Sequence, residues 1–122
     1  MAKRGAGARQ KGANFERTLA NYLTENTSLI AKRGLAQTRG GGAEVSDVDI
    51  KFIHVEAKNH KRCNIKAALE QAINDSAANG KLPVAITKDL RKPILCTMLL
   101  EDWLKLFNSF VEIQRAQEQE NI

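Results

Sequence analysis

The chain has 122 residues, the usual size of one domain and enough for one modest hydrophobic core. Its 43% hydrophobic and 27% charged residues exclude a wholly disordered chain, and the absence of an apolar run of membrane-spanning length excludes a transmembrane protein. The net charge of +5 is concentrated in residues 1–66, which hold 13 Lys/Arg against 6 Asp/Glu, whereas residues 67–122 hold 6 against 8. Such an excess attracts polyanions and predicts a nucleic-acid partner, with solubility alone as the competing explanation.

The start of the chain and its cysteines bear on where the protein resides. No charged segment followed by an apolar one opens the sequence, so no secretory signal is predicted. Cys63 and Cys96 form neither a disulfide framework nor a zinc-ligand spacing. We therefore expect free thiols, an intracellular, cytoplasmic setting and no membrane partner.

The first third of the chain predicts a tail, a helix and a loop. Residues 1–12 carry four cations and several glycines without apolar periodicity, which predicts a mobile basic tail. Residues 13–26 place Phe15, Leu19 and Leu23 at helical spacing, so an amphipathic helix is expected there. Residues 28–44 predict a short irregular strand followed by a glycine-rich loop that could approach a ligand closely.

Residues 46–62, SDVDIKFIHVEAKNHKR, predict a β-hairpin that turns at residues 51–52. Because side chains alternate across a strand, the apolar residues share one face: Val48, Ile50, Ile53, Val55 and Ala57. The opposite face carries the polar residues: Asp47 opposite Glu56, Asp49 opposite His54, and Lys58. Acidic side chains are therefore crowded on one face of the hairpin.

The rest of the chain predicts a helix, two strands and a closing helix. Residues 64–80 have a clear helical pattern, with Asn64 as the N-cap and Gly80 as the stop signal. Residues 82–88 and 93–99 are short β-rich segments separated by a turn, and residues 101–114 form a helix with aromatic residues. The last residues are polar and expected to fray. The predicted order is α-β-β-β-α-β-β-α.

The acidic face of the hairpin needs an explanation, since like charges opposite each other on neighbouring strands are destabilising. A divalent cation supplies one, because Mg²⁺ takes one or two carboxylates together with water and substrate phosphate. Lys58, two residues beyond Glu56, would then reach a scissile phosphate or an attacking water. The competing interpretation is an ordinary hairpin whose charged face is solvated. His54 and His60 lack a third ligand at zinc spacing, so structural or DNA-contacting roles are expected.

Cations near the hairpin and in the basic tail are candidates for phosphate contacts. The predicted DNA-binding residues are Lys3, Arg4, Arg9, Lys11, Arg39, His60, Lys61, Arg62 and Lys66. Solvated surface charge is the simpler interpretation of any one of them taken alone.

Several of these segments together resemble the PD-(D/E)XK nuclease superfamily. They are the helix GANFERTLANYL with its glutamate, then SDV, then IHVEAK, then the helix NIKAALEQA. The likeness is greatest to small phage and archaeal Holliday junction resolvase-like members and covers about residues 11–106. The α-β-β-β-α-β core of the superfamily agrees with the order of elements predicted above.

The resemblance assigns roles to residues by their place in the motifs. The helical glutamate is Glu16, the metal-binding aspartate is Asp47, and the Glu-x-Lys pair is Glu56 and Lys58. The backbone carbonyl of Ala57 would be a further metal ligand, and the helical glutamate would bind the metal directly or through water. These four side chains are the predicted catalytic residues.

The sequence departs from the pattern of the superfamily beside the metal-binding aspartate. The proline that usually precedes it is Ser46 here, and Asp49 competes with Asp47 for the same role. We prefer Asp47, because the interval from Asp49 to Glu56 leaves little room for a turn with both side chains level. The resemblance also suggests that Gln71 on the following helix faces the site, although a surface glutamine is the simpler interpretation.

The resemblance implies a metal-dependent DNA endonuclease that uses Mg²⁺, with Mn²⁺ able to substitute. The expected activity is that of a structure-selective Holliday junction resolvase, which acts as a homodimer on branched or four-way DNA, in a phage-encoded setting. The alternatives are another nuclease of the superfamily, restriction-like or exonucleolytic, and a non-catalytic nucleic-acid-binding module.

The expected fold is α/β, with a mixed β-sheet flanked by helices. A restriction-endonuclease-like core, α-β-β-β-α-β, would carry an extra C-terminal strand and helix. A single nuclease domain is expected over residues 13–115, between a flexible basic tail at residues 1–12 and a polar tail at residues 116–122.

Overall fold

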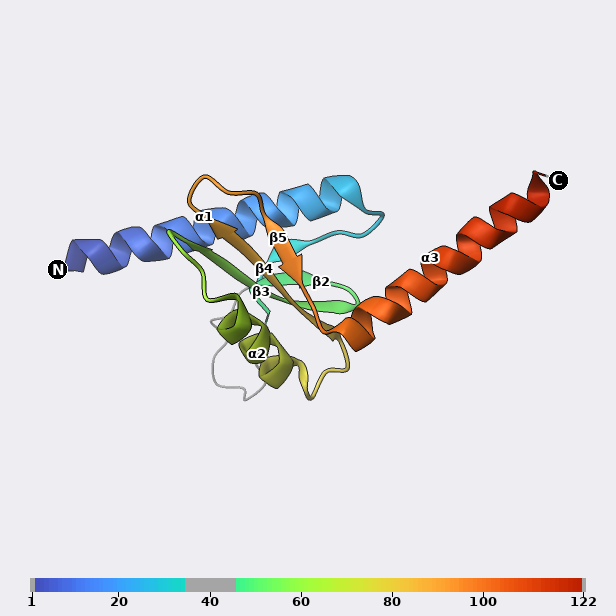
Figure 1. The fold of residues 1–122 in the computed structure, drawn as a ribbon. Helices are drawn as coiled ribbons and strands as arrows, with labels where there is room; N and C mark the ends of the chain where they lie inside the picture. Colours follow the sequence, from blue (N-terminus) through green and yellow to red (C-terminus); the bar gives the residue numbers. More distant parts are fainter. Residues whose placement is uncertain (1, 35–45, 122) are drawn as a thin grey trace.

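The computed structural model describes residues 2–34 and 46–121, which form a five-stranded mixed sheet with helices packed against it (Figure 1). The described elements are α1 (Ala2–Asn26), β1 (Lys32–Arg33), β2 (Val48–Ile50), β3 (Ile53–His60), α2 (Ile65–Ser76), β4 (Leu82–Asp89), β5 (Leu95–Thr97) and α3 (Leu100–Glu120). Both the α/β class and the predicted order of elements are confirmed.

The sheet has the strand order β1-β2-β3-β4-β5, so β3 is its central strand. The predicted hairpin forms β2 and β3, which are antiparallel, and Asp49 pairs with His54 as the register required. The chain then crosses through α2 to β4, which runs parallel to β3, and β5 returns antiparallel. Because β3 and β4 are parallel, their carboxyl ends meet at one edge of the sheet.

Helix α1 covers one face of the sheet, where the apolar residues of the hairpin meet it. The buried cluster on this side contains Phe15, Leu19, Ala20, Ala31, Val48, Ile50, Val55, Ala57, Val84 and Ile86. The helical spacing of the α1 residues and the two-residue spacing of the strand residues explain why one contiguous core results.

Helix α2 covers the opposite face and buries polar side chains of β3. Asn64 caps this helix, because its side chain accepts a hydrogen bond from the N–H of Ala67 at 3.0 Å. His54 and Glu56 are only 1% and 3% exposed on this side. The part of this face that carries His54 and Glu56 is therefore not an ordinary solvated surface, and a carboxylate buried in this way requires partners.

Three predicted boundaries differ from the structure. Helix α1 begins at Ala2, within the segment expected to be a mobile tail, and α3 continues to Glu120, through much of the segment expected to fray. Residues 115–120, RAQEQE, are all good helix formers, so α3 continues beyond its apolar stretch. The extension of α1 contains Gly5, Gly7 and Gly12, which are poor helix formers, so helix propensity does not explain it. Helix α2 ends at Ser76 before the predicted stop, and Gly80 instead takes a φ of 72° on the way into β4.

Helix α3 extends away from the sheet instead of covering it (Figure 1). Only Asp102 is buried among its described residues, and Trp103, Phe107 and Phe110 are 41–54% exposed. No helix among the described residues combines the length and hydrophobicity that a membrane crossing needs.

Candidate active site

Asp47 lies immediately before β2, at the point where the pairing of the hairpin stops. Its backbone N–H donates to the carbonyl of Val55 at 2.9 Å, so it is the last residue of this strand to pair through its backbone. Its carboxylate Oδ2 then accepts a hydrogen bond from the N–H of Ala57 at 2.8 Å. The side chain thus takes the place of the next backbone acceptor and is held beside β3.

The same geometry gives the direction of the Ala57 carbonyl. Backbone groups of residues two apart on a strand point toward the same neighbouring strand. Val55 pairs with Asp47 on the β2 side, and the N–H of Ala57 is directed to that side as well. The carbonyl oxygen of Ala57 therefore faces the edge of β3 on which the Asp47 carboxylate lies.

Glu56 and Lys58 are on the α2 face of β3, next to this edge. Lys58 Nζ lies 3.1 Å from Glu56 Oε2, and the Glu56 side chain is only 4% exposed against 33% for Lys58. Burial, together with the negative charge of Asp47, raises the pKa of Glu56 to about 7, and the contact with Lys58 only partly opposes this shift. Two carboxylates are therefore crowded in a poorly solvated position.

Glu16 reaches this group from α1. Burial raises its pKa, the hydrogen bond from Arg33 lowers it, and the charge of Asp47 raises it further. Arg33 Nε donates to Glu16 Oε1 at 2.9 Å. The structure thus brings the predicted helical glutamate near Asp47, with Arg33 of β1 as a partner that the sequence did not indicate.

Asp49 has a different environment from Asp47. Its side chain is 65% exposed, and its carboxylate lies 3.7 Å from Lys81 Nζ. This ion pair places Asp49 beside the residue that leads into β4. The geometry therefore favours Asp47 as the aspartate that acts together with Glu56.

Among comparisons with known proteins, one family model matches most of the chain. Residues 7–121 match the model of a family described as "Phage putative PDDEXK endonuclease". The chain belongs to this PD-(D/E)XK nuclease family. No curated protein and no solved structure matches the chain.

PD-(D/E)XK nucleases generally use a divalent metal ion. Asp47 and Glu56 supply two hard carboxylate oxygens, and the Ala57 carbonyl faces the same edge. Within residues 2–34 and 46–121, no three acidic, histidine or cysteine side chains are grouped closely enough to hold a metal by themselves. Two carboxylates with a carbonyl suit Mg²⁺, which usually retains several waters. The residues therefore fit such an ion, and Glu16 beside them forms an ion pair with Arg33.

The described residues among the predicted DNA contacts of this nuclease occupy three regions: α1, the end of β3 and α2. Lys3, Arg4, Arg9 and Lys11 all belong to α1, and His60, Lys61 and Arg62 are exposed at the end of β3. Lys66 and Gln71 are exposed on α2, which agrees with the simpler interpretation of the glutamine. Arg39 and the glycine-rich loop lie outside the described residues.

The two histidines lie in different environments. His54 is buried, and its Nδ1 lies 3.2 Å from the side-chain nitrogen of Asn79, just beyond α2. His60 is exposed at the end of β3. The buried position of His54 is that of a structural residue, and His60 stays a predicted DNA contact.

Proposed function

We propose that this nuclease is a metal-dependent DNA endonuclease whose site is formed by Asp47, Glu56, Lys58 and Glu16. The observation that carries the proposal is the burial of Glu56 beside Asp47. The carbonyl of Ala57 faces the same side of β3 as the Asp47 carboxylate. Two adjacent carboxylates in a poorly solvated position repel each other unless a proton or a cation is shared between them. A binding module has no use for such a pair on a basic surface.

The preferred ion is Mg²⁺, with Mn²⁺ as a substitute, held by Asp47, Glu56 and the Ala57 carbonyl. When bound, it supplies a Lewis acid for the phosphate and lowers the pKa of a water nucleophile. Lys58 Nζ, beside Glu56 at 3.1 Å, is placed to orient the nucleophile or to stabilise charge that develops on the phosphate. Glu16, held by Arg33, would act through a water at the open side of the site.

The preferred substrate is a four-way DNA junction, which needs two symmetric cuts and therefore two active sites. Support for a second copy comes from α3. Its large apolar side chains are 41–69% exposed, which leaves on the order of 600 Å² of apolar surface on the helix. Monomers rarely expose a larger patch, and standard interfaces bury about 800 Å² per partner. We propose that α3 packs against α3 of a second copy.

A panel of labelled DNAs tests the proposed activity. Duplex, single-stranded, flap and four-way junction substrates are incubated with the protein in Mg²⁺, in Mn²⁺ and in a chelator. We expect cleavage that requires the metal, with the junction cut fastest and at symmetric positions. Faster cleavage of duplex or of free ends would favour the restriction-like or exonuclease alternative. Binding without any cleavage would support the non-catalytic module.

A further inference from the structure

The connections that follow β3 and β4 lie side by side at one edge of the sheet. The two strands are parallel neighbours, and His60 pairs with Asp89 at their ends. The N–H of Leu90 then donates to the carbonyl of Lys61 at 3.3 Å, which joins the connection before α2 to the connection before β5. These two loops therefore form one continuous surface.

Asp89 fastens the two loops from within. Its Oδ1 accepts a hydrogen bond from the N–H of Cys63 at 2.8 Å, and its carbonyl accepts one from the N–H of Lys92 at 3.1 Å. The hydrogen bond from Cys63 lowers the pKa of Asp89, and the charges of Arg62 and Lys92 lower it further. The carboxylate at this edge is thus engaged by backbone, while the cations around it face outward.

Four exposed cations project from the joined loops. They are Lys61, Arg62, Arg91 and Lys92, and we refer to them as the basic edge surface. None of them takes part in an ion pair with any residue that the structure describes. An open hollow of about 550 Å³ is lined by Lys61, Arg62 and Leu90. A cluster of this kind, with no internal counter-charge beyond one engaged aspartate, favours an anionic ligand.

Arg91 has a backbone conformation that its side chain does not explain. It is the third residue of the turn from Asp89 to Lys92, and its φ is 60°. Glycine and asparagine are the residues that favour this region at such a position. Backbone strain of this kind clusters at functional sites, so Arg91 is a candidate for a functional contact.

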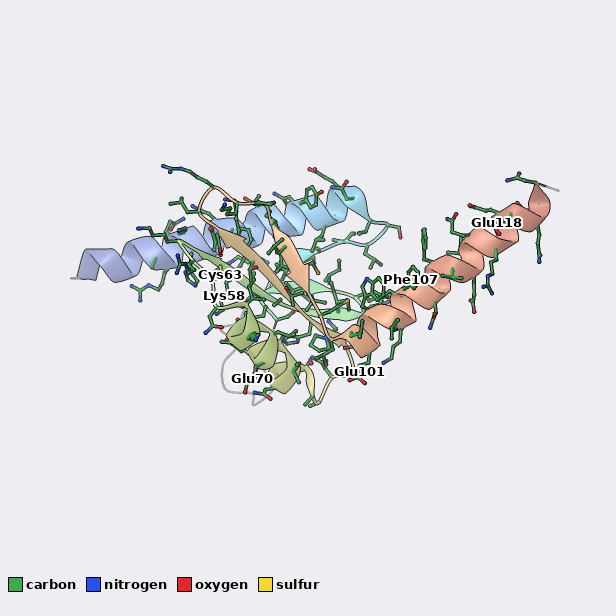
Figure 2. All side chains as sticks on the ribbon, in the orientation of Figure 1. Lys58, Cys63, Glu70, Glu101, Phe107 and Glu118 are labelled. Atoms are coloured by element: carbon green, nitrogen blue, oxygen red, sulfur yellow. The ribbon has the colours of Figure 1, made fainter. Side chains whose placement is uncertain are left out.

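The basic edge surface is close to the proposed catalytic lysine. Cys63 Sγ lies 3.5 Å from the carbonyl of Lys58, and Figure 2 shows these two residues next to each other. Lys61 follows Lys58 by three residues, which corresponds to roughly 10 Å along an extended chain. Each strand of DNA has a phosphate about every 3.4 Å along the helix axis. The separation thus suits phosphates a few nucleotides from the cleaved bond.

We propose that the basic edge surface binds the phosphate backbone of the DNA strand next to the cleaved bond, with Arg91 as a direct contact. The inference rests on the proposed function, since DNA is the ligand. It extends the binding site from the loop after β3 to the turn after β4. The role of these residues is to position the strand, because neither loop supplies a group to the reacting phosphate.

The test separates the charge of Arg91 from its backbone. Arg91→Gly and Arg91→Asn remove the cation and keep a residue that accepts φ near 60°, and Lys51→Gln removes one charge at the opposite end of β3. Affinity for a labelled junction is measured in Ca²⁺ over a range of NaCl concentrations. We expect both Arg91 variants to bind roughly three- to tenfold more weakly, with a salt slope reduced by about 0.9. Their melting temperatures should equal or exceed that of the parent.

The outcomes distinguish the two levels of the proposal. Parent-like affinity and salt slope in both Arg91 variants would overturn this inference and leave the proposed function intact. An equal loss in Lys51→Gln would overturn it too, because net charge would then explain the effect. A parent protein that binds none of the DNAs would overturn the proposed function and the inference with it.

Discussion

The carboxylate of Asp47 accepts a 2.8 Å hydrogen bond from the backbone of Ala57, the residue between Glu56 and Lys58. This one contact fixes the position of the aspartate relative to the side chains of Glu56 and Lys58. It also means that an asparagine, whose side-chain oxygen accepts the same bond, keeps the local structure. Charge and geometry can therefore be separated at this position.

Asp47→Asn should abolish cleavage while leaving the fold and DNA binding intact. The variant loses one charge of the proposed metal site, and removal of a negative charge near phosphate should leave affinity equal or higher. Asp49→Asn is the matched control, since it loses only an exposed contact with Lys81 worth about 0–1 kcal/mol. Single-turnover cleavage in Mg²⁺ and gel-shift affinity in Ca²⁺ measure the two effects. Parent-like cleavage by Asp47→Asn would refute the assignment, and loss in Asp49→Asn instead would move the ligand to that residue.

Lys58→Ala should reduce the chemical step and leave metal binding largely unchanged. The amine acts on the nucleophile or the transition state, where loss of one such group costs on the order of a hundredfold or more in rate. Because Lys58 also stabilises the ionised form of Glu56, the comparison is best made at a pH above 8. Calorimetric titration with Mn²⁺ and single-turnover cleavage give the two readouts, and Lys105→Ala on α3 controls for the loss of a lysine. Unchanged cleavage would remove Lys58 from the catalytic group.

The stability of the metal-free protein should depend on pH through Glu56. Burial raises its pKa from 4.5 to about 7, so the folded state holds a proton that the unfolded state releases between these values. This contribution is complete below about pH 4.5 and is lost as the pH rises through about 7. The free energy of unfolding should fall by up to about 3 kcal/mol across this window, and Glu56→Gln should flatten the fall.

Urea unfolding in a chelator, at several pH values, measures this dependence. Metal affinity should rise over the same window, because the ion competes with the proton for the carboxylate. An equal slope in Glu56→Gln would assign the pH dependence to other groups, such as Glu16, whose pKa is shifted in the same direction.

Gly34→Ala should destabilise the protein and impair cleavage together. A Cβ at Gly34 would clash with the backbone carbonyl oxygen of Ser46, and the N–H of Gly34 donates to the carbonyl of Asp47 at 2.8 Å. Backbone on one side of the contact must move, at a cost of about 1–3 kcal/mol, and Asp47 moves with it. Gly12→Ala in α1 is the control, since a Cβ added at Gly12 would have nothing within 4 Å. That variant should gain about 0.5–1 kcal/mol in thermal or urea unfolding, with unchanged cleavage. Equal behaviour of the two variants would show that the close approach at Gly34 is unimportant.

Phe107→Glu should convert a dimer to a monomer. Phe107 is stacked on Trp103 at 4.9 Å within the exposed apolar face of α3, so a charge there should be excluded from a helix pair. Analytical ultracentrifugation of the parent and of Phe107→Glu measures whether two copies associate. Gln117→Glu is the control, because it adds the same charge to the polar distal part of the helix. A monomeric parent, or a dimer that persists in Phe107→Glu, would contradict the proposed α3 contact.

Local patterns in the sequence were enough to predict the hairpin and α2. The alternation through Val48 and Val55 fixed the register, and Asn64 marked the start of the helix, since each signal involves residues close in the chain. The Arg33–Glu16 ion pair could not be read in this way, because it joins a two-residue strand to a distant helix. The exposure of α3 was also hidden, since an apolar helical face looks the same whether it covers its own sheet or another copy.

The burial of Glu56 on the α2 face could not be predicted for a related reason. A strand pattern gives the face on which a side chain lies, and the packing of α2 decides whether water reaches that face. The positive φ of Arg91 likewise has no signature in the sequence, because glycine or asparagine would have been expected at that turn position. The sequence thus showed that acidic residues gather on the hairpin, but only the structure showed that Glu56 is buried beside Asp47.

The position of β3 between β2 and β4 has a consequence for how activity arises during folding. The hairpin that holds Asp47 beside Ala57 is formed by residues close in sequence. The parallel strands β3 and β4 are separated in the sequence by the whole of α2, so they pair only when this crossover connection is in place. Pairings of long sequence separation form late, because loop-closure entropy opposes them. Burial of Glu56 and assembly of the loops at the sheet edge both wait for that step. Partly folded chains should therefore lack the assembled site and cleave no DNA, so that a destructive activity becomes available only in the completed molecule.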